Sequence, residues 1–233
     1  MDPWENNYLL SVHVEASHIK SEEQDDGEAS RRDTHDSNDA SPKVGLAWID
    51  LSSGDFFTQG ADLSVLPSAV ARIGPREIVL ANAFRDCQNP HLLAMVREDR
   101  HIVTYHSAPK HATSAAAWSH MLDEGASDFN EAAFSPEELA AGSFLLHYVS
   151  TQLQGKTARL QAPVSQHADE HMAIDRNTLR ALEIRTTLRD GRHEGSLLHA
   201  VRRTVTKSGA RLLSQRLSQS PQSHTLHDFY ILE

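Results

Sequence analysis

The stretch Val44–Gln59, VGLAWIDLSSGDFFTQ, decides the fold because it carries two strand patterns on either side of a turn. Val44–Asp50 is mostly apolar, and Asp55–Gln59 brings two phenylalanines and a threonine. Between them, Ser53-Gly54 is a strong turn signal. The pattern predicts a β-hairpin, and the segments on both sides of it are expected to belong to the same sheet.

Strand and helix patterns alternate around this hairpin. Upstream, Tyr8–Val14 predicts a buried strand. Downstream, apolar residues recur at helical spacing from Leu63 to Ile73, with Pro67 tolerable only in the first turn and Gly74-Pro75 as the stop signal. Later patterns predict a strand at Glu77–Ala81, a helix at His91–Val96, a strand at Ile102–Tyr105 and a helix around Trp118–Leu122. Strands that alternate with helices indicate an α/β layer with a partly parallel sheet.

A capping box predicts the start of a longer helix at Ser135. Serine is a good N-cap, Pro136 suits the first helical position, and Glu138 stands three residues after the cap. Apolar residues then continue to Leu153. The pattern predicts a helix over this whole segment.

The stretch Met172–Leu217 predicts three further helical pieces. Asp175 is a candidate N-cap for a helix that begins at the next residue and ends near Gly191. Leu197–Val201 gives one or two more turns, and Thr206 can cap a last helix. The C-terminal part of the chain is therefore expected to be all-helical.

Composition excludes several classes of protein. The 233 residues suit one large domain or two small ones. A mean hydropathy of −0.47 and the lack of a long apolar run exclude a membrane span, and residues 1–20 lack the features of a secretory signal. Cys87 is the only cysteine, which excludes an intrachain disulfide and favours a reducing intracellular compartment.

Charge is distributed unevenly along a chain of net charge −10. Met1–Asp50 holds twelve acidic and four basic residues, a net −8, whereas His171–Ser218 holds ten basic and four acidic residues, a net +6. The polar, acidic residues 17–43 are expected to form a disordered insertion. At the basic end, six residues are candidate phosphate or DNA contacts: Arg185, Arg189, Arg202, Arg203, Lys207 and Arg211. Spacing alone favours a solvated basic face, although Lys207 and Arg211 could also meet a partner's carboxylates.

Two motifs for catalysis are incomplete. Gly155-Lys156-Thr157 looks like the end of a phosphate-binding loop, but Ser150 stands where glycine is required and a helix precedes it instead of a strand. His167–His171 has the H-x-x-E-H spacing of some zinc peptidases but lies in a polar loop, so a chance match is expected. Neither a nucleotide site nor a zinc site is predicted.

Other potentially reactive residues are also expected to be structural. His101, His106 and His111 are five apart and do not share a helical face. Cys87 has no identifiable partner for a nucleophilic site. A magnesium nuclease would need clustered carboxylates, whereas Tyr8–Val14 has none, and Asp50 and Asp55 suit turn roles.

Three groups of motifs resemble MutS-type DNA mismatch-repair proteins. MAIDRNTLRALEI at 172–184 and GSLLHAVRRTVTKSGARLLSQRLS at 195–218 resemble the start of the core and lever region. VGLAWIDLSSGDFFTQ at 44–59 and IGPREIVLA at 73–81 resemble the connector domain, particularly that of fungal mitochondrial-type homologues. The helix from Ser135 looks like the first core helix, through the residues Leu145, Leu146, Tyr148, Thr151 and Gln152.

This resemblance implies a fold class and a domain order. Residues 1–130 would form a ribonuclease-H-like α/β connector domain whose sheet begins with three antiparallel strands. Residues 131–218 would form the start of an all-α core/lever domain, followed by a divergent tail at 219–233. The chain is expected to be a fragment or a truncated gene product.

The resemblance also implies a function without chemistry of its own. In the family, the connector and lever couple an ATPase to a clamp on mismatched DNA, and a MutL-type partner, dimerisation, ATP and Mg²⁺ belong to the full-length protein. No cofactor, metal site or catalytic residue is expected in this chain, and a mitochondrial location is suspected, with the nucleus as the alternative. The competing hypothesis is a stand-alone α/β interaction module whose basic helical end binds an acidic protein, and a degenerate magnesium nuclease ranks last.

Overall fold

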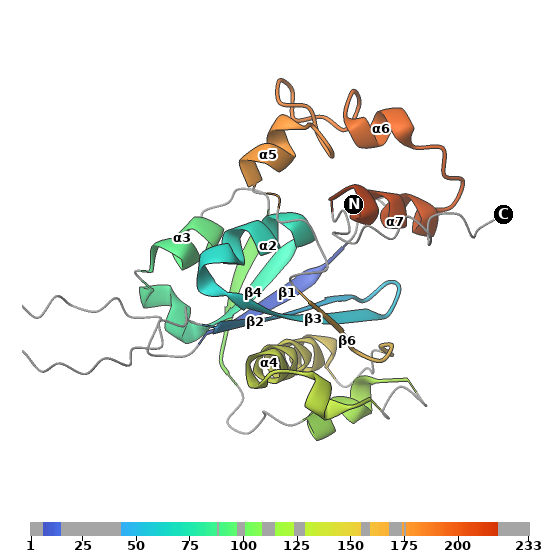
Figure 1. The fold of residues 1–233 in the computed structure, drawn as a ribbon. Coiled ribbons are helices and arrows are strands. Elements are labelled where there is room, and N and C mark those ends of the chain that lie inside the picture. Colours follow the sequence, from blue (N-terminus) through green and yellow to red (C-terminus); the bar gives the residue numbers. More distant parts are fainter. Residues whose placement is uncertain are drawn as a thin grey trace, which may run out of the picture.

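The computed structural model describes residues 7–14, 43–87, 89–96, 101–108, 115–123, 129–154, 159–167, 174 and 176–218. The described residues from 7 to 167 form a sheet covered by helices, here called the α/β unit (Figure 1). Residues 176–218 contain three helices and are here called the helical segment. The predicted acidic insertion, apart from Lys43, and the predicted tail at 219–233 lie outside the described residues.

Six strands form one mixed sheet in the order β5-β4-β1-β2-β3-β6. The strands are β1 (Leu9–Val14), β2 (Lys43–Asp50), β3 (Asp55–Asp62), β4 (Glu77–Ala81), β5 (Ile102–His106) and β6 (Val164–Gln166). β2 lies between β1 and β3 and pairs antiparallel with both. β4 and β5 run parallel to their neighbours, and so does β6 beside β3. The predicted hairpin, the partly parallel sheet and the three initial antiparallel strands are confirmed.

Helices cover both faces of this sheet (Figure 1). On one face lie α2 (Leu66–Ile73) and α3 (Pro90–Val96), whose apolar residues pack against Leu46 and Trp48 of β2. On the other lie α4 (Pro136–Leu153) and the 3₁₀ helix Ala115–Met121, which pack against the alternate β2 residues. Because β2 contributes to both cores, it is apolar along its length instead of alternating with polar residues.

The segment after β3 begins and ends its helix as the sequence predicts. Pro67 lies in the first turn of α2, and Gly74 adopts a left-handed conformation with φ 62° at the C-terminal cap. The Gly74 N–H donates to the Val70 carbonyl at 2.8 Å. On the inner side of α2, Arg72 is buried and donates to Gln59 of β3. Burial lowers the pKa of Arg72 to about 10, so its guanidinium stays protonated at neutral pH.

The predicted capping box of α4 is present and does more than begin the helix. The Ser135 N–H donates to Oε2 of Glu138 at 2.9 Å, and the Glu138 N–H donates to Oγ of Ser135 at 3.2 Å. The other carboxylate oxygen of Glu138 accepts the hydroxyls of Thr58 on β3 and Ser165 on β6, both at 2.8 Å. Glu138 is 4% exposed, so one buried carboxylate ties α4 to two strands.

Packing places α4 in the α/β unit. The first turn of α4 lies so close to Gly45 of β2 that a Cβ there would be 1.9 Å from the Glu137 carbonyl oxygen. Further along, the Ser11 hydroxyl of β1 donates to the Ala141 carbonyl at 2.7 Å. The helix predicted to open an all-α core therefore covers the sheet, and the boundary predicted at residue 130 falls inside this packing unit. Capping signals show where a helix begins, but they do not show which surface it covers.

Two local predictions are corrected by the structure, and one strand is missed. The strand β6 is missed because its three residues, Val164–Gln166, carry no strand pattern. The segment around Trp118 is a 3₁₀ helix (Ala115–Met121), where the sequence predicts an ordinary helix. The helix α5 (Arg176–Ala181) ends well before Gly191, and the chain turns at Glu183, which has φ 48°. The Asp175 cap itself lies outside the described residues.

The last two helices begin where they are predicted. Ser196 caps α6 (Leu197–Val201) by accepting the His199 N–H, and Thr206 accepts the Gly209 N–H at the start of α7 (Lys207–Ser218). The buried residues of α7 recur every four positions and are small: Ala210, Ser214 and Ser218. Leu213 and Leu217 of the same helix are half-buried.

Candidate phosphate-binding residues and the interdomain contact

The six residues predicted to contact phosphate fall into two groups in the structure. Arg185 and Arg211 lie where the helical segment meets the α/β unit, and each donates hydrogen bonds there. Arg189, Arg203 and Lys207 are exposed, and Arg202 is half-buried. The sequence therefore identifies one basic region, whereas the structure separates an inner pair from outer residues.

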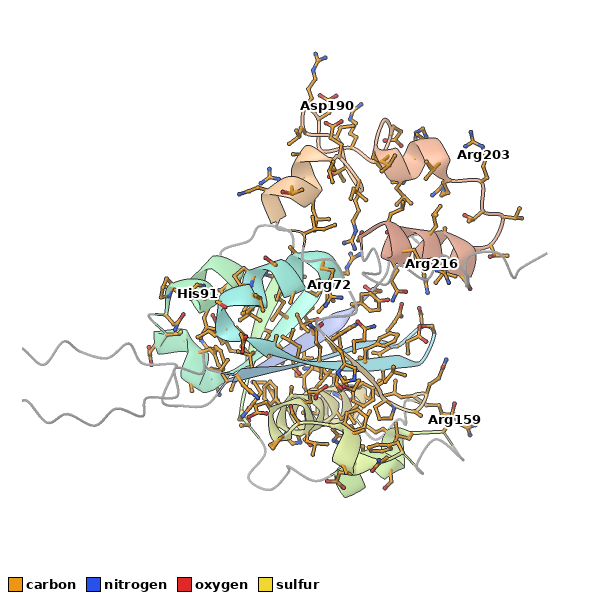
Figure 2. All side chains as sticks on the ribbon, viewed as in Figure 1. Arg72, His91, Arg159, Asp190, Arg203 and Arg216 are labelled. Carbon is orange, nitrogen blue, oxygen red and sulfur yellow. The ribbon has the colours of Figure 1, made fainter. Side chains whose placement is uncertain are left out.

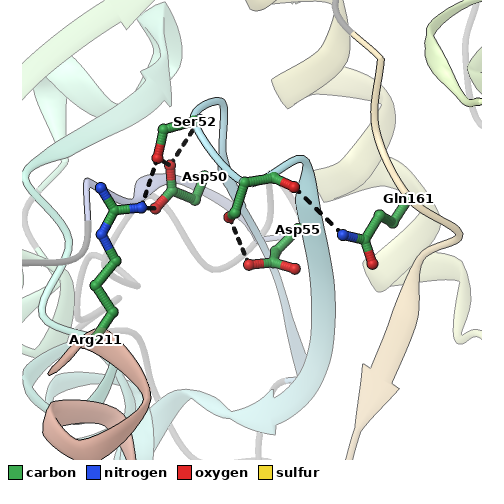
Figure 3. A network of polar contacts seen from close by, with 6 residues as sticks. Asp50, Ser52, Asp55, Gln161 and Arg211 are labelled. Carbon is green, nitrogen blue, oxygen red and sulfur yellow. Dashed lines mark hydrogen bonds and ion pairs between the residues drawn. The ribbon is translucent and has the colours of Figure 1, made fainter. Parts of the chain in front are cut away.

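Arg211 of α7 contacts the turn between β2 and β3 (Figure 3). Its Nη1 donates to the Ser52 hydroxyl at 2.7 Å and lies 3.6 Å from Oδ2 of Asp50. Oδ1 of the same carboxylate accepts the Ser52 N–H at 2.8 Å and the Ser52 hydroxyl at 2.6 Å. The Asp50 side chain is 2% exposed, so Arg211 supplies the counter-charge of a buried carboxylate.

Arg185 contacts the C-terminus of α2. Its Nη2 donates to the Arg72 carbonyl at 3.2 Å, and its Nε donates to the Ser218 hydroxyl at 3.0 Å. A cation is favourable there, because the last carbonyls of a helix carry partial negative charge. A Cβ at Gly74 would lie 1.9 Å from Nη1 of Arg185. Glycine at this cap therefore allows the left-handed turn and also leaves space for the Arg185 guanidinium.

The phenol of Tyr8 lies among the charges of this contact. Burial is the first cause that raises the pKa of Tyr8 to about 12, and the nearby carboxylates of Asp55 and Asp50 raise it further. The positive charges of Arg185 and Arg211 lower the pKa of Tyr8. Two acids from the hairpin and two bases from the helical segment therefore act on one buried phenol, which stays protonated at neutral pH.

Three of the outer basic residues, Arg189, Arg203 and Lys207, are exposed to solvent. Figure 2 shows Arg203 and Asp190 on the far side of the helical segment. Arg203 donates to the carbonyls of Ala200 and Arg202 at 3.1 and 3.0 Å, at the end of α6. The Arg189 side chain is 92% exposed and lies 3.9 Å from Asp190, an exposed pair that contributes little to stability. This outer surface is the part of the predicted set that solvent ions can reach.

Sequence reasoning misses the partners of the inner pair. The turn role predicted for Asp50 is confirmed by its bonds to Ser52, but its contact with α7 is not foreseen. Lys207 and Arg211 are predicted to meet phosphate or the carboxylates of another protein, whereas the carboxylate beside Arg211 belongs to this same chain. No sequence signal joins two residues so far apart.

The remaining motifs do not assemble a reactive site in the described part of the chain. No three histidine, cysteine, aspartate or glutamate side chains gather there as a metal site would require. Cys87 is a free cysteine buried in the core under α2 and α3. His106 ends β5, as expected of a strand-end histidine, and its ring packs beside His147 and Tyr148. Gly155-Lys156-Thr157, His111 and residues 168–171 lie outside the described residues.

No described helix combines the length and the apolar character that crossing a membrane would require.

Two family models match the chain, in the order in which the two structural parts occur. The model of MutS domain II matches residues 29–161, which is more than half of the chain and includes α4. The model of MutS domain III matches residues 177–224, which covers the helical segment from α5 onward. The division between the two matches therefore follows the division in packing.

Bacterial MutS proteins are similar in sequence to this chain over most of its length. The DNA mismatch repair protein MutS of Dinoroseobacter shibae is 33% identical over 174 residues, covering 74% of this chain and 19% of that protein. The MutS proteins of Rhodopseudomonas palustris and Cereibacter sphaeroides are each 35% identical, over 181 and 188 residues, covering 76% and 80% of this chain and 19% and 20% of theirs. The chain thus spans about a fifth of the length of these relatives. The expected likeness to fungal mitochondrial-type homologues is not supported by these bacterial matches.

Proposed function

Because this chain belongs to the MutS family, we propose that it acts as part of a DNA mismatch-repair protein, with the α/β unit as connector and the helical segment as the start of the core and lever. The observation that carries the proposal is the match of MutS domains II and III, in that order, to two separately packed parts of the chain. The bacterial relatives named as mismatch-repair proteins agree with it.

Disruption of the gene that encodes this chain tests the proposal. We expect a higher spontaneous mutation rate, concentrated in runs of one repeated base, because such runs produce the slipped pairs that mismatch repair removes. A fluctuation assay with a frameshift reporter measures this rate, and reintroduction of the intact gene is the control. An unchanged rate in the disrupted strain would contradict the proposal.

We further propose that the α/β unit has a ribonuclease-H-like fold. The support is the sheet, in which the antiparallel strands β1, β2 and β3 precede the parallel strands β4 and β5. α4 packs on one face of that sheet, so the boundary between connector and core is proposed to lie between Gln166 and Arg176.

The proposed role of the two parts is to couple movements between an ATPase and a DNA clamp, and this chain is proposed to have no catalytic site. ATP and Mg²⁺, a MutL-type partner and MutS-type dimerisation would belong to the full-length protein. A mitochondrial location stays a prediction, which imaging of a fluorescent fusion would test.

The purified chain is expected to hydrolyse no ATP. The motif Gly155-Lys156-Thr157 has Ser150 where a phosphate-binding loop requires glycine, and α4 precedes it where such a loop requires a strand. A coupled assay with ATP and Mg²⁺ measures this directly, with a buffer blank as control. Turnover that increases with the concentration of the chain would refute the prediction.

A second candidate function is phosphate binding by the outer basic surface. The double replacement Arg203→Ala and Lys207→Ala is expected to weaken binding of duplex DNA equally for unrelated sequences, because phosphate contacts carry no sequence information. It should also reduce the slope of log K against log salt by about 0.9 for each phosphate that the variant no longer neutralises. Fluorescence anisotropy over a salt series measures both quantities.

Arg159→Ala is the matched control, because Arg159 is an exposed arginine of the α/β unit, far from Arg203 (Figure 2). An equal loss of binding free energy for each positive charge removed, in the control and in the double variant, would show that net charge, and not this surface, governs binding. The alternative interaction module predicts instead an acidic protein on the same residues, and displacement of such a protein by duplex DNA would show that both use one surface.

A further inference from the structure

Two arginines of the helical segment contact the α/β unit at separate places. Arg211 reaches the turn between β2 and β3, and Arg185 reaches the C-terminus of α2. Arg185 also donates to Ser218, at the end of the same helix α7 that carries Arg211. The two contacts are therefore joined through α7, and neither can shift far without the other.

The residues that α7 buries offer little apolar surface. They are one alanine and two serines, Ala210, Ser214 and Ser218, while Leu212 of the same helix is 48% exposed. Burial of so little apolar area contributes weakly to association, since the hydrophobic effect scales with that area. Leu213 and Leu217 of α7 are half-buried and add apolar contact, whereas the hydrogen bonds of Arg211 and Arg185 fix where α7 lies on the α/β unit.

Charged contacts of this kind are readily exchanged for water. Asp50 is buried and its carboxylate contacts Arg211 and Ser52, and the Nε of Arg211 is buried without a hydrogen-bond partner. Separation of the two parts would return water to the carboxylate and to the guanidinium, which offsets much of the forfeited attraction. Salt, or an anion that pairs with Arg211, would therefore favour the undocked arrangement.

We propose that Arg185 and Arg211 form a releasable clasp that holds the helical segment on the α/β unit. Breaking either the Arg211 contact or the Arg185 contact frees the segment to move relative to the sheet. A phosphate can bind Arg211 only if the guanidinium leaves Asp50 and Ser52. Anion binding at Arg211 and docking of the helical segment therefore exclude each other. The clasp rests on contacts inside this chain, and it holds independently of the proposed part in mismatch repair.

Distance measurement between two spin labels on the whole chain tests the clasp. The labels are placed at Ser150→Cys on α4 and Leu212→Cys on α7, both exposed positions, with Cys87→Ala to remove the native thiol. At low salt, we expect one narrow distance distribution. Arg211→Glu and Arg185→Glu should each replace it with a broad distribution at longer distances, and salt at about 1 M, where charges are screened within about 3 Å, should broaden the distribution of the otherwise unchanged chain.

Two variants complete the test. Arg211→Lys keeps the charge and should retain most of the narrow distribution, whereas Arg189→Glu makes the same charge change at an exposed outer residue and should leave it unchanged. Circular dichroism shows that each variant is folded. A narrow distribution that persists in Arg211→Glu, an equal effect of Arg189→Glu, or a broad distribution in the parent would each overturn the clasp.

Discussion

Replacement of Gly45 by alanine is expected to lower the free energy of unfolding by about 3 kcal/mol, because α4 must move off β2 to admit a side chain. The added Cβ would lie 1.9 Å from the carbonyl oxygen of Glu137 and 2.8 Å from the backbone nitrogen of Glu138. These are backbone atoms at the first turn of a helix, so no side-chain rotation relieves the overlap. Urea denaturation followed by circular dichroism measures the change.

Gly60→Ala is the control, since Gly60 of β3 pairs directly with Gly45. A Cβ at Gly60 would meet only side-chain atoms, of Ser135 at 3.7 Å and Glu138 at 3.8 Å, which are ordinary contacts. Alanine there should change stability by less than about 1 kcal/mol, because it also restricts the unfolded chain. Equal effects of the two substitutions would mean that close packing of α4 on β2 is not the cause.

Removal of the Glu138 carboxylate is expected to lower the free energy of unfolding by about 3 kcal/mol as well, since it leaves one buried donor and two half-buried donors without an acceptor. In Glu138→Ala the hydroxyls of Thr58 and Ser165 and the N–H of Ser135 all lose their partner. The substitution should also loosen β6, which the Ser165 bond helps to hold against α4. Thermal unfolding gives the stability, and hydrogen exchange of residues 159–167 shows whether β6 opens first.

Glu137→Ala is the matched comparison for Glu138→Ala. Glu137 lies in the same helical turn but is only half-buried, so it contributes chiefly through its charge near the N-terminus of α4. That effect is less than about 1 kcal/mol. If both alanine variants lost the same stability, the buried network around Glu138 would not be what secures the helix.

Local signals in the sequence predict most of the elements of this fold. The hairpin around Ser53-Gly54, the stop of α2 at Gly74 and the capping box at Ser135 each depend on residues within a few positions of one another. Such signals act through backbone geometry and short-range hydrogen bonds. They are therefore readable without knowledge of the rest of the chain.

Contacts between distant segments are beyond the reach of those signals. The sequence does not show that the helix from Pro136 packs on the sheet, because its surroundings, Gly45 and Thr58, come from strands far earlier in the chain. For Arg211 the sequence suggests a solvated face or the carboxylate of another protein, and it does not indicate the contact with Asp50 of the same chain. Whether the exposed Arg189, Arg203 and Lys207 contact phosphate stays a prediction.

The turn between β2 and β3 acts as a spacer of fixed length. The two strands that it joins are paired along their whole length, from Lys43 opposite Asp62 to Asp50 opposite Asp55. Ser52, in this turn, also accepts a hydrogen bond from Arg211. An insertion in most surface loops is tolerated, but here each added residue would carry Ser52 away from the helix that contacts it. The shortness of this loop therefore sets the register between the two parts of the chain, and lengthening it would change their relative position while leaving both of them folded.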